Sequence, residues 1–80
     1  MKLGRLLNEV AEETWVCIRY NGKNHYLWSP DYIGWHPDTM AKLGPLLQRE
    51  VEDFGVTRRK NPEEPKKQVS MILINLAYEG

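Results

Sequence analysis

The strongest constraint on the fold is the segment 15–28, WVCIRYNGKNHYLW, in which two apolar runs flank the pair Asn21-Gly22. Both residues accept the positive φ angles of a tight type I′ turn, so the segment is predicted to form a β-hairpin. A two-residue turn would place Val16 opposite Leu27. This register determines which side chains share each face of the hairpin.

Both faces of the predicted hairpin are largely apolar, because strand side chains alternate between the two faces. One face would carry Val16, Ile18 and Leu27. The other would carry Trp15, Cys17, Tyr26 and Trp28, with Arg19 and Asn24 towards the turn. Such a sheet must cover its second face with its own helices and loops, or present that face to another molecule.

Two helical segments are expected. Before the hairpin, apolar residues at helical spacing predict a short amphipathic helix, and these residues are Leu3, Leu6, Leu7 and Val10. Prolines and glycines interrupt the stretch 29–45, which is therefore predicted to be an irregular link. Within it, one helical turn would begin at Pro37 and end at Leu43, and Gly44-Pro45 would begin another.

Two further strands are predicted in the second half of the chain. The segment 51–59 alternates in polarity and favours a strand, and the charged, proline-containing stretch 60–67 is expected to be an exposed loop. The segment 68–78 contains the strongest strand signal. Apolar residues alternate on both of its faces, Val69, Met71 and Leu73 on one and Ile72, Ile74 and Leu76 on the other. A central strand covered on both sides is predicted.

These elements predict a single α+β domain over residues 1–80. It would have an N-terminal helix and a four-stranded, mainly antiparallel sheet of two hairpins, joined by a short irregular helical link. Because a domain of 80 residues buries only about 60–65% of its unfolded surface, most of its aromatic side chains are needed for stability.

The charge balance disfavours several classes of protein. Eleven Lys and Arg residues match eleven Asp and Glu residues, so no net field attracts nucleic acid or an anionic membrane, and a polyanionic DNA mimic is disfavoured. The single cysteine, Cys17, is typical of a reducing compartment. We find no apolar run near the roughly 18 residues of a membrane span, and no continuous apolar signal segment. A cytoplasmic protein without membrane contact is expected.

No motif indicates catalysis. The potential metal ligands and acid-base groups concentrate in one region, and they are Cys17, His25, Asp31, His36 and Asp38. In the predicted register Cys17 and His25 point to opposite faces, which leaves no metal geometry. We therefore expect a protein that is not an enzyme and has no cofactor or metal.

Two groups of residues are candidate binding sites. Aromatic rings beside polar and basic side chains are typical of protein interfaces and of nucleobase stacking. The candidates of this kind are Arg19, Lys23, Asn24, Tyr26, Tyr32 and Trp35. Alternatively, the irregular link folds back and buries the rings in a second small core.

The second group is a basic loop, which could contact phosphates or an acidic protein patch. It consists of Arg58, Arg59, Lys60, Lys66 and Lys67, five bases against the two acids Glu63 and Glu64, for a net charge of +3. Alternatively, the loop is a solvated hairpin tip whose charges discourage aggregation.

The stretches LGRLLNEVAEETWVCIRYNG, LGPLLQREVEDFGVT and VSMILINL carry a resemblance. Together they are similar to small proteins common in phages and mobile elements of Gram-positive bacteria, in which a leucine-rich helix precedes a hairpin and a short link precedes a final strand pair. Some small phage proteins of this size inhibit host defence, including anti-CRISPR proteins. The segments 32–40 and 60–67 depart from the pattern, so the resemblance assigns no residue a role.

Three functional hypotheses follow. The leading one is a non-enzymatic protein-binding module, an anti-CRISPR-like inhibitor of a larger host defence protein in a bacterial cell. The second is a small nucleic-acid or nucleotide binder that uses the aromatic hairpin face and the basic loop. The third is a structural or regulatory module whose second sheet face is closed by a homodimer. Salt dependence of binding separates the second from the others, and mass in solution separates the third.

Overall fold

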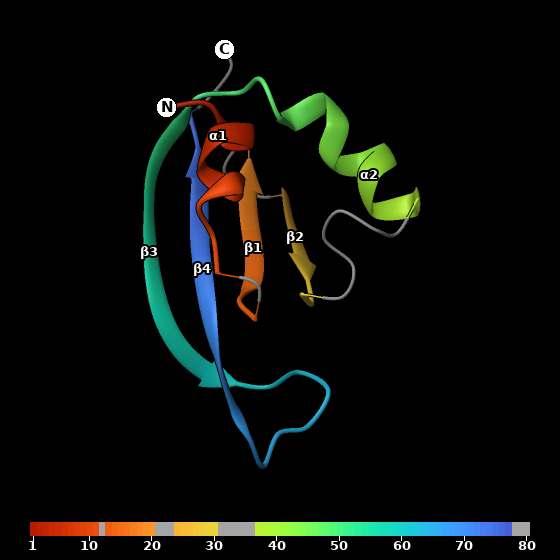
Figure 1. Ribbon diagram of the computed structural model, residues 1–80, viewed down its shortest axis with the longest axis vertical. Coiled ribbons are helices and arrows are strands. Elements are labelled where there is room, and N and C mark those ends of the chain that lie inside the picture. Colours follow the sequence, from red (N-terminus) through yellow and green to blue (C-terminus); the bar gives the residue numbers. More distant parts are fainter. Residues whose placement is uncertain (12, 21–23, 31–36, 78–80) are drawn as a thin grey trace.

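The computed structural model describes residues 1–11, 13–20, 24–30 and 37–77, with Asn24 and His25 described by their backbone alone (Figure 1). Two helices, a 3₁₀ turn and four strands follow one another in this order: α1 (Leu3–Asn8), β1 (Trp15–Tyr20), β2 (Asn24–Trp28), α2 (Pro37–Leu43), η1 (Gly44–Leu46), β3 (Val51–Lys60) and β4 (Gln68–Leu76). The strands form one sheet in the order β2-β1-β4-β3. The predicted α+β class is confirmed.

The sheet consists of two antiparallel hairpins, β1–β2 and β3–β4, joined at its centre by parallel pairing of β1 with β4. It is thus mainly antiparallel, as predicted, with one parallel pair. The sheet order confirms that β4 is a central strand.

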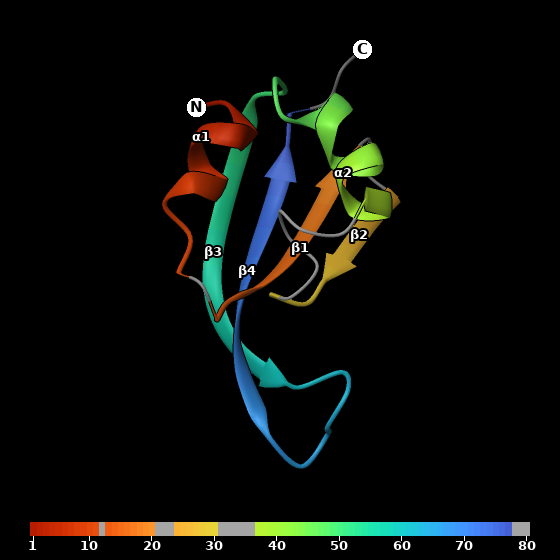
Figure 2. The same cartoon turned by 45° about the vertical axis from the view of Figure 1, so that its right-hand side comes forward.

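Both helical segments pack on the same face of the sheet (Figure 2). α1 contributes Leu3 and Leu6 to the core, and α2 and η1 contribute Leu43 and Leu46. The sheet contributes Val16, Ile18, Trp28, Ile72, Ile74 and Leu76. The core therefore lies on one side of the sheet, between it and three short helical elements.

The start of α1 is fastened to the segment before β3. Leu3 N–H donates to the Arg49 carbonyl at 2.9 Å, and Gly4 N–H donates to the Leu47 carbonyl at 3.0 Å. A Cβ at Gly4 would lie 3.4 Å from that same Leu47 oxygen. Glycine, a poor helix former, is suited to this position because the helix backbone comes so close to the link.

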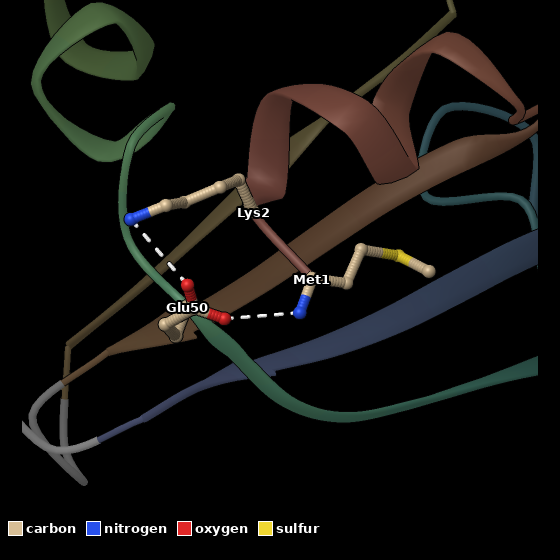
Figure 3. Close-up of polar contacts among 3 residues, drawn as sticks. All are labelled: Met1, Lys2 and Glu50. Carbon is tan, nitrogen blue, oxygen red and sulfur yellow. Dashed lines mark hydrogen bonds and ion pairs between the residues drawn. The ribbon is translucent and has the colours of Figure 1, made fainter.

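Glu50 adds an electrostatic contact at the same place. Its carboxylate lies 2.9 Å from the Met1 amino group and 3.4 Å from Lys2 Nζ (Figure 3). Hydrogen bonds from these two cations hold the pKa of Glu50 below its usual value. All three side chains are exposed, so the contact positions the chain more than it stabilises the fold.

The prediction of a two-residue hairpin turn is wrong, because the observed pairing of β1 with β2 is shifted by one residue. Val16 pairs with Trp28, Cys17 with Leu27, and three residues separate the paired Tyr20 and Asn24. A shift of one residue moves every β2 side chain to the other face. Tyr26 and Trp28 therefore join the core-facing side, and Leu27 moves to the second face, where 43% of its surface is exposed. The observed register buries Trp28 and part of Tyr26 in place of one leucine, which removes more apolar surface from water.

The two faces of β4 differ more than predicted. Ile72, Ile74 and Leu76 lie in the core, whereas Leu73 on the second face is only half-buried. No helix in the described part of the chain packs on that second face. The expectation that β4 is covered on both sides therefore holds at Met71, which is 6% exposed, but not at the half-buried Leu73. The physical reason is length, because two helices of six and seven residues cannot cover both faces of a four-stranded sheet.

Candidate binding surface

We call the face of the sheet away from the helices the open face. Because residues paired across strands share a face, the pairing identifies its members. They are Cys17 and Arg19 of β1, Leu27 of β2, Asp53, Gly55, Thr57 and Arg59 of β3, and Val69, Leu73 and Asn75 of β4. At one end of the same face, Trp15 and Met71 are buried. Beside Trp15, a smaller hollow is lined by Glu63 of the β3–β4 loop, so this loop approaches that end.

The centre of the open face is hollowed. A depression of about 430 Å³ is lined by apolar and cationic side chains, chiefly Cys17, Arg19, Leu27, Arg59, Leu73 and Asn75. Gly55 lies opposite Leu73, and a Cβ built there would meet nothing within 4 Å. The missing side chain thus leaves the leucine accessible from the β3 side.

Two arginines dominate the electrostatics of this hollow. Arg19 and Arg59 are both exposed, and in the described part of the chain neither is within ion-pair distance of a carboxylate. Asp53, an acid of the same face, instead accepts a hydrogen bond of 2.6 Å from Asn75 Nδ2. The open face therefore offers apolar surface beside two exposed guanidinium groups, which are suited to carboxylates.

Cys17 lines the hollow, and the pKa of its thiol reflects the burial and the charges there. Burial raises the pKa of the Cys17 thiol, while the charges of Arg19 and Arg59 act in the opposite direction without cancelling the rise. Less of the nucleophilic thiolate is then present near neutral pH than in an ordinary cysteine.

This environment predicts slow alkylation of Cys17. At pH 8, the folded protein should react with iodoacetamide several-fold more slowly than the same chain in urea, and its rate should still be rising above pH 9. Arg19→Gln should slow the reaction further, because removing a nearby cation raises the pKa again. A folded protein that reacts as fast as the unfolded chain would show that the thiol is neither shielded nor shifted. The rates can be followed by mass spectrometry.

The residues of the predicted aromatic site do not lie on one face of the sheet. Arg19 lies on the open face, but Tyr26 is on the core-facing side, stacked between Tyr20 at 5.4 Å and Trp28 at 5.0 Å between ring centroids. The Tyr20 hydroxyl donates to that of Tyr26 at 3.1 Å, and Lys42 Nζ lies 5.8 Å from the Tyr26 ring centroid. The remaining candidates lie outside the described residues, namely Lys23, Tyr32, Trp35 and the side chain of Asn24.

The predicted basic loop does not form one surface. Arg58 pairs with Ser70 and Arg59 with Val69, so the two arginines point to opposite faces of the sheet. Lys60 ends β3, and in the exposed turn beyond it Lys67 lies 3.5 Å from the Glu64 carboxylate. Lys66 is exposed in the same turn. Only Arg59 of this group contributes to the hollow.

The residues that sequence reasoning missed are Leu27, Gly55 and Leu73. The sequence does indicate an uncovered apolar face that includes Leu73, because β4 is equally apolar on both faces and the helices are too short to cover both. Leu27 could not be found in this way, because its face depends on the hairpin register.

The described residues contain no group of three or more His, Cys, Asp or Glu side chains able to hold a metal ion. Of the potential ligands considered above, Asp31, His36 and the side chain of His25 lie outside them, and the observed register sets His25 opposite Arg19. Among the helices of the described chain, each is too short or too polar to cross a membrane. Comparison with protein-family models, curated proteins and solved structures gives no match.

Proposed function

We propose that this chain is a non-enzymatic protein-binding module. Its open face would dock on a protein surface that presents an apolar side chain flanked by carboxylates. The observation that carries the proposal is the hollow, where an apolar floor that includes Leu27 and Leu73 lies beside Arg19 and Arg59. Arginine is enriched at interface hot spots and binds carboxylates through paired hydrogen bonds.

The size of the molecule is compatible with this role. It measures 40 by 24 by 23 Å, so one sheet face is comparable with the roughly 800 Å² that each partner buries in a standard interface. The sheet is anchored from behind by the core, which makes the face rigid and lowers the entropic cost of binding.

A more specific proposal is that the module inhibits a bacterial defence protein by occupying one of its functional surfaces. The resemblance to small proteins of phages and mobile elements supports it, and so does the absence of a catalytic motif in the sequence. The nucleic-acid hypothesis is less well supported, because Tyr26 and Trp28 stack on the core-facing side instead of offering their rings to bases.

Gly55→Gln should weaken binding while leaving the fold intact. The new side chain would lie beside Leu73, which lines the hollow, and would obstruct access to that leucine, yet its Cβ meets nothing within 4 Å. Gly44→Gln is the matched control, since a Cβ is equally unhindered there but Gly44 belongs to η1 on the other side of the sheet. We expect at least about tenfold weaker binding for Gly55→Gln alone, with both variants melting near the parent temperature.

The measurement starts with affinity capture from a bacterial lysate by the parent and both variants. A captured protein supports the proposal if the purified pair also protects Cys17 from alkylation and if Gly55→Gln loses it. Equal capture by Gly55→Gln would place the binding surface elsewhere. A steep fall in affinity with salt, together with capture of nucleic acid, would favour the second hypothesis.

A further inference from the structure

β3 has an unpaired outer edge. On its inner side it pairs with β4 along its whole length, and it is the last strand of the sheet (Figure 1). On its outer side only the start is occupied, where Val51 N–H donates to the Met1 carbonyl at 2.8 Å and Lys2 forms a bridge with Glu50. On this outer side, no other segment of the described chain forms backbone hydrogen bonds with residues 52–60. This segment is long enough to pair with another strand.

The free edge also carries exposed apolar side chains. Phe54 and Val56 are 50% and 67% exposed, although they lie on the helix-covered face, opposite Ile74 and Ile72. Natural edge strands are usually protected by shortness, proline, bulges or charge. Here the irregularity lies at the beginning, between Val51 and Asp53, and the rest of the strand is regular.

The charges of β3 are arranged so that the strand is complementary to itself. Its first half carries Glu52 and Asp53, and its second half carries Arg58, Arg59 and Lys60. Two copies side by side in parallel would bring like charges together, whereas two antiparallel copies bring each acidic half against a basic half. Opposite charges across a strand pair are stabilising and like charges are not.

Geometry restricts the register of such a pair. A two-fold axis perpendicular to the sheet keeps each face continuous, so residues from the same face must lie opposite one another. With the axis at Val56, each Val56 lies opposite its equivalent, Asp53 lies opposite Arg59, and Phe54 lies opposite Arg58. In each case the two residues share a face in the observed sheet. An arginine beside an aromatic ring adds a favourable cation–π contact.

We propose that two copies of this chain associate through β3, antiparallel and centred on Val56, into one continuous sheet. The proposal is independent of the binding role of the open face. It differs from a homodimer closed face to face, because both open faces remain uncovered and lie on the same side of the combined sheet. The assembly would then be bivalent for the partner, which increases avidity where two sites can be reached together.

Sedimentation velocity over about 10–500 µM tests the association. The parent should shift from the 9.4 kDa chain towards twice that mass as concentration rises. Val56→Lys should weaken the dimer at least about tenfold, because two cations would meet at the axis, while a residue so exposed should not affect folding. Leu27→Lys, on the open face far from β3, is the matched control and should leave the dimer unchanged.

A charge reversal tests the antiparallel register. Glu52→Lys alone should weaken the dimer, since the new lysine would face Lys60 of the second copy, and adding Lys60→Glu should restore it. A single species of 9.4 kDa up to 500 µM would overturn the proposal. So would a dimer that survives Val56→Lys but is lost in Leu27→Lys, because that outcome assigns the contact to the open face.

Discussion

Trp28→Ala is expected to lower the free energy of unfolding by about 3–5 kcal/mol, the usual cost of deleting a buried aromatic side chain. Trp28 is 9% exposed, belongs to the core and stacks on Tyr26. Its neighbour Leu27 is the matched control, since it lies on the open face, and Leu27→Ala should cost less than about 1 kcal/mol. Urea unfolding followed by circular dichroism measures both, because it does not depend on tryptophan fluorescence.

This pair of variants tests the hairpin register directly. With a two-residue turn the two side chains would exchange faces, and the ranking of the two losses would reverse. A domain this small has little stability to lose, so Trp28→Ala could abolish folding altogether. Trp28→Phe then preserves the comparison, because it removes only part of the buried ring and should still cost more than Leu27→Ala.

Ile74→Ala should also be strongly destabilising, by about 2–5 kcal/mol, because the side chain is 1% exposed and surrounded by the core. Leu73, the preceding residue of the same strand, is only half-buried on the open face, and Leu73→Ala should cost about 1 kcal/mol. Thermal and urea unfolding of the two variants compares the two faces of β4. Equal losses would contradict an open face, because they would mean that Leu73 is as well covered as Ile74.

Local patterns predicted most of the elements. Four leucine and valine positions at helical spacing mark α1, and alternating polarity marks β3 and β4. The prolines and glycines of the link mark the beginnings of α2 and η1, at Pro37 and Gly44. These signals are reliable because they depend on residues within a few positions of one another.

The hairpin register and the binding surface depend on distant contacts. Asn21-Gly22 favours a short turn, but packing of Trp28 and Tyr26 against a core built by other segments outweighs that preference. The parallel pairing of β1 with β4 joins residues more than fifty positions apart, and no local pattern encodes it. The position of Arg59 beside Cys17 follows from that pairing, so the hollow could not be assembled from sequence.

The position of β4 has a consequence for synthesis in the cell. This strand lies between β1 and β3 but follows both in the chain, so the centre of the sheet is the last part of it to be made. Until residues 68–76 have emerged from the ribosome, β1 and β3 lack β4, the strand with which both of them pair. Val16 and Ile18 then lack Ile72 and Ile74, the residues that they pair with in the core. A nascent chain at that stage exposes apolar strand edges, which makes it a substrate for chaperones and proteases.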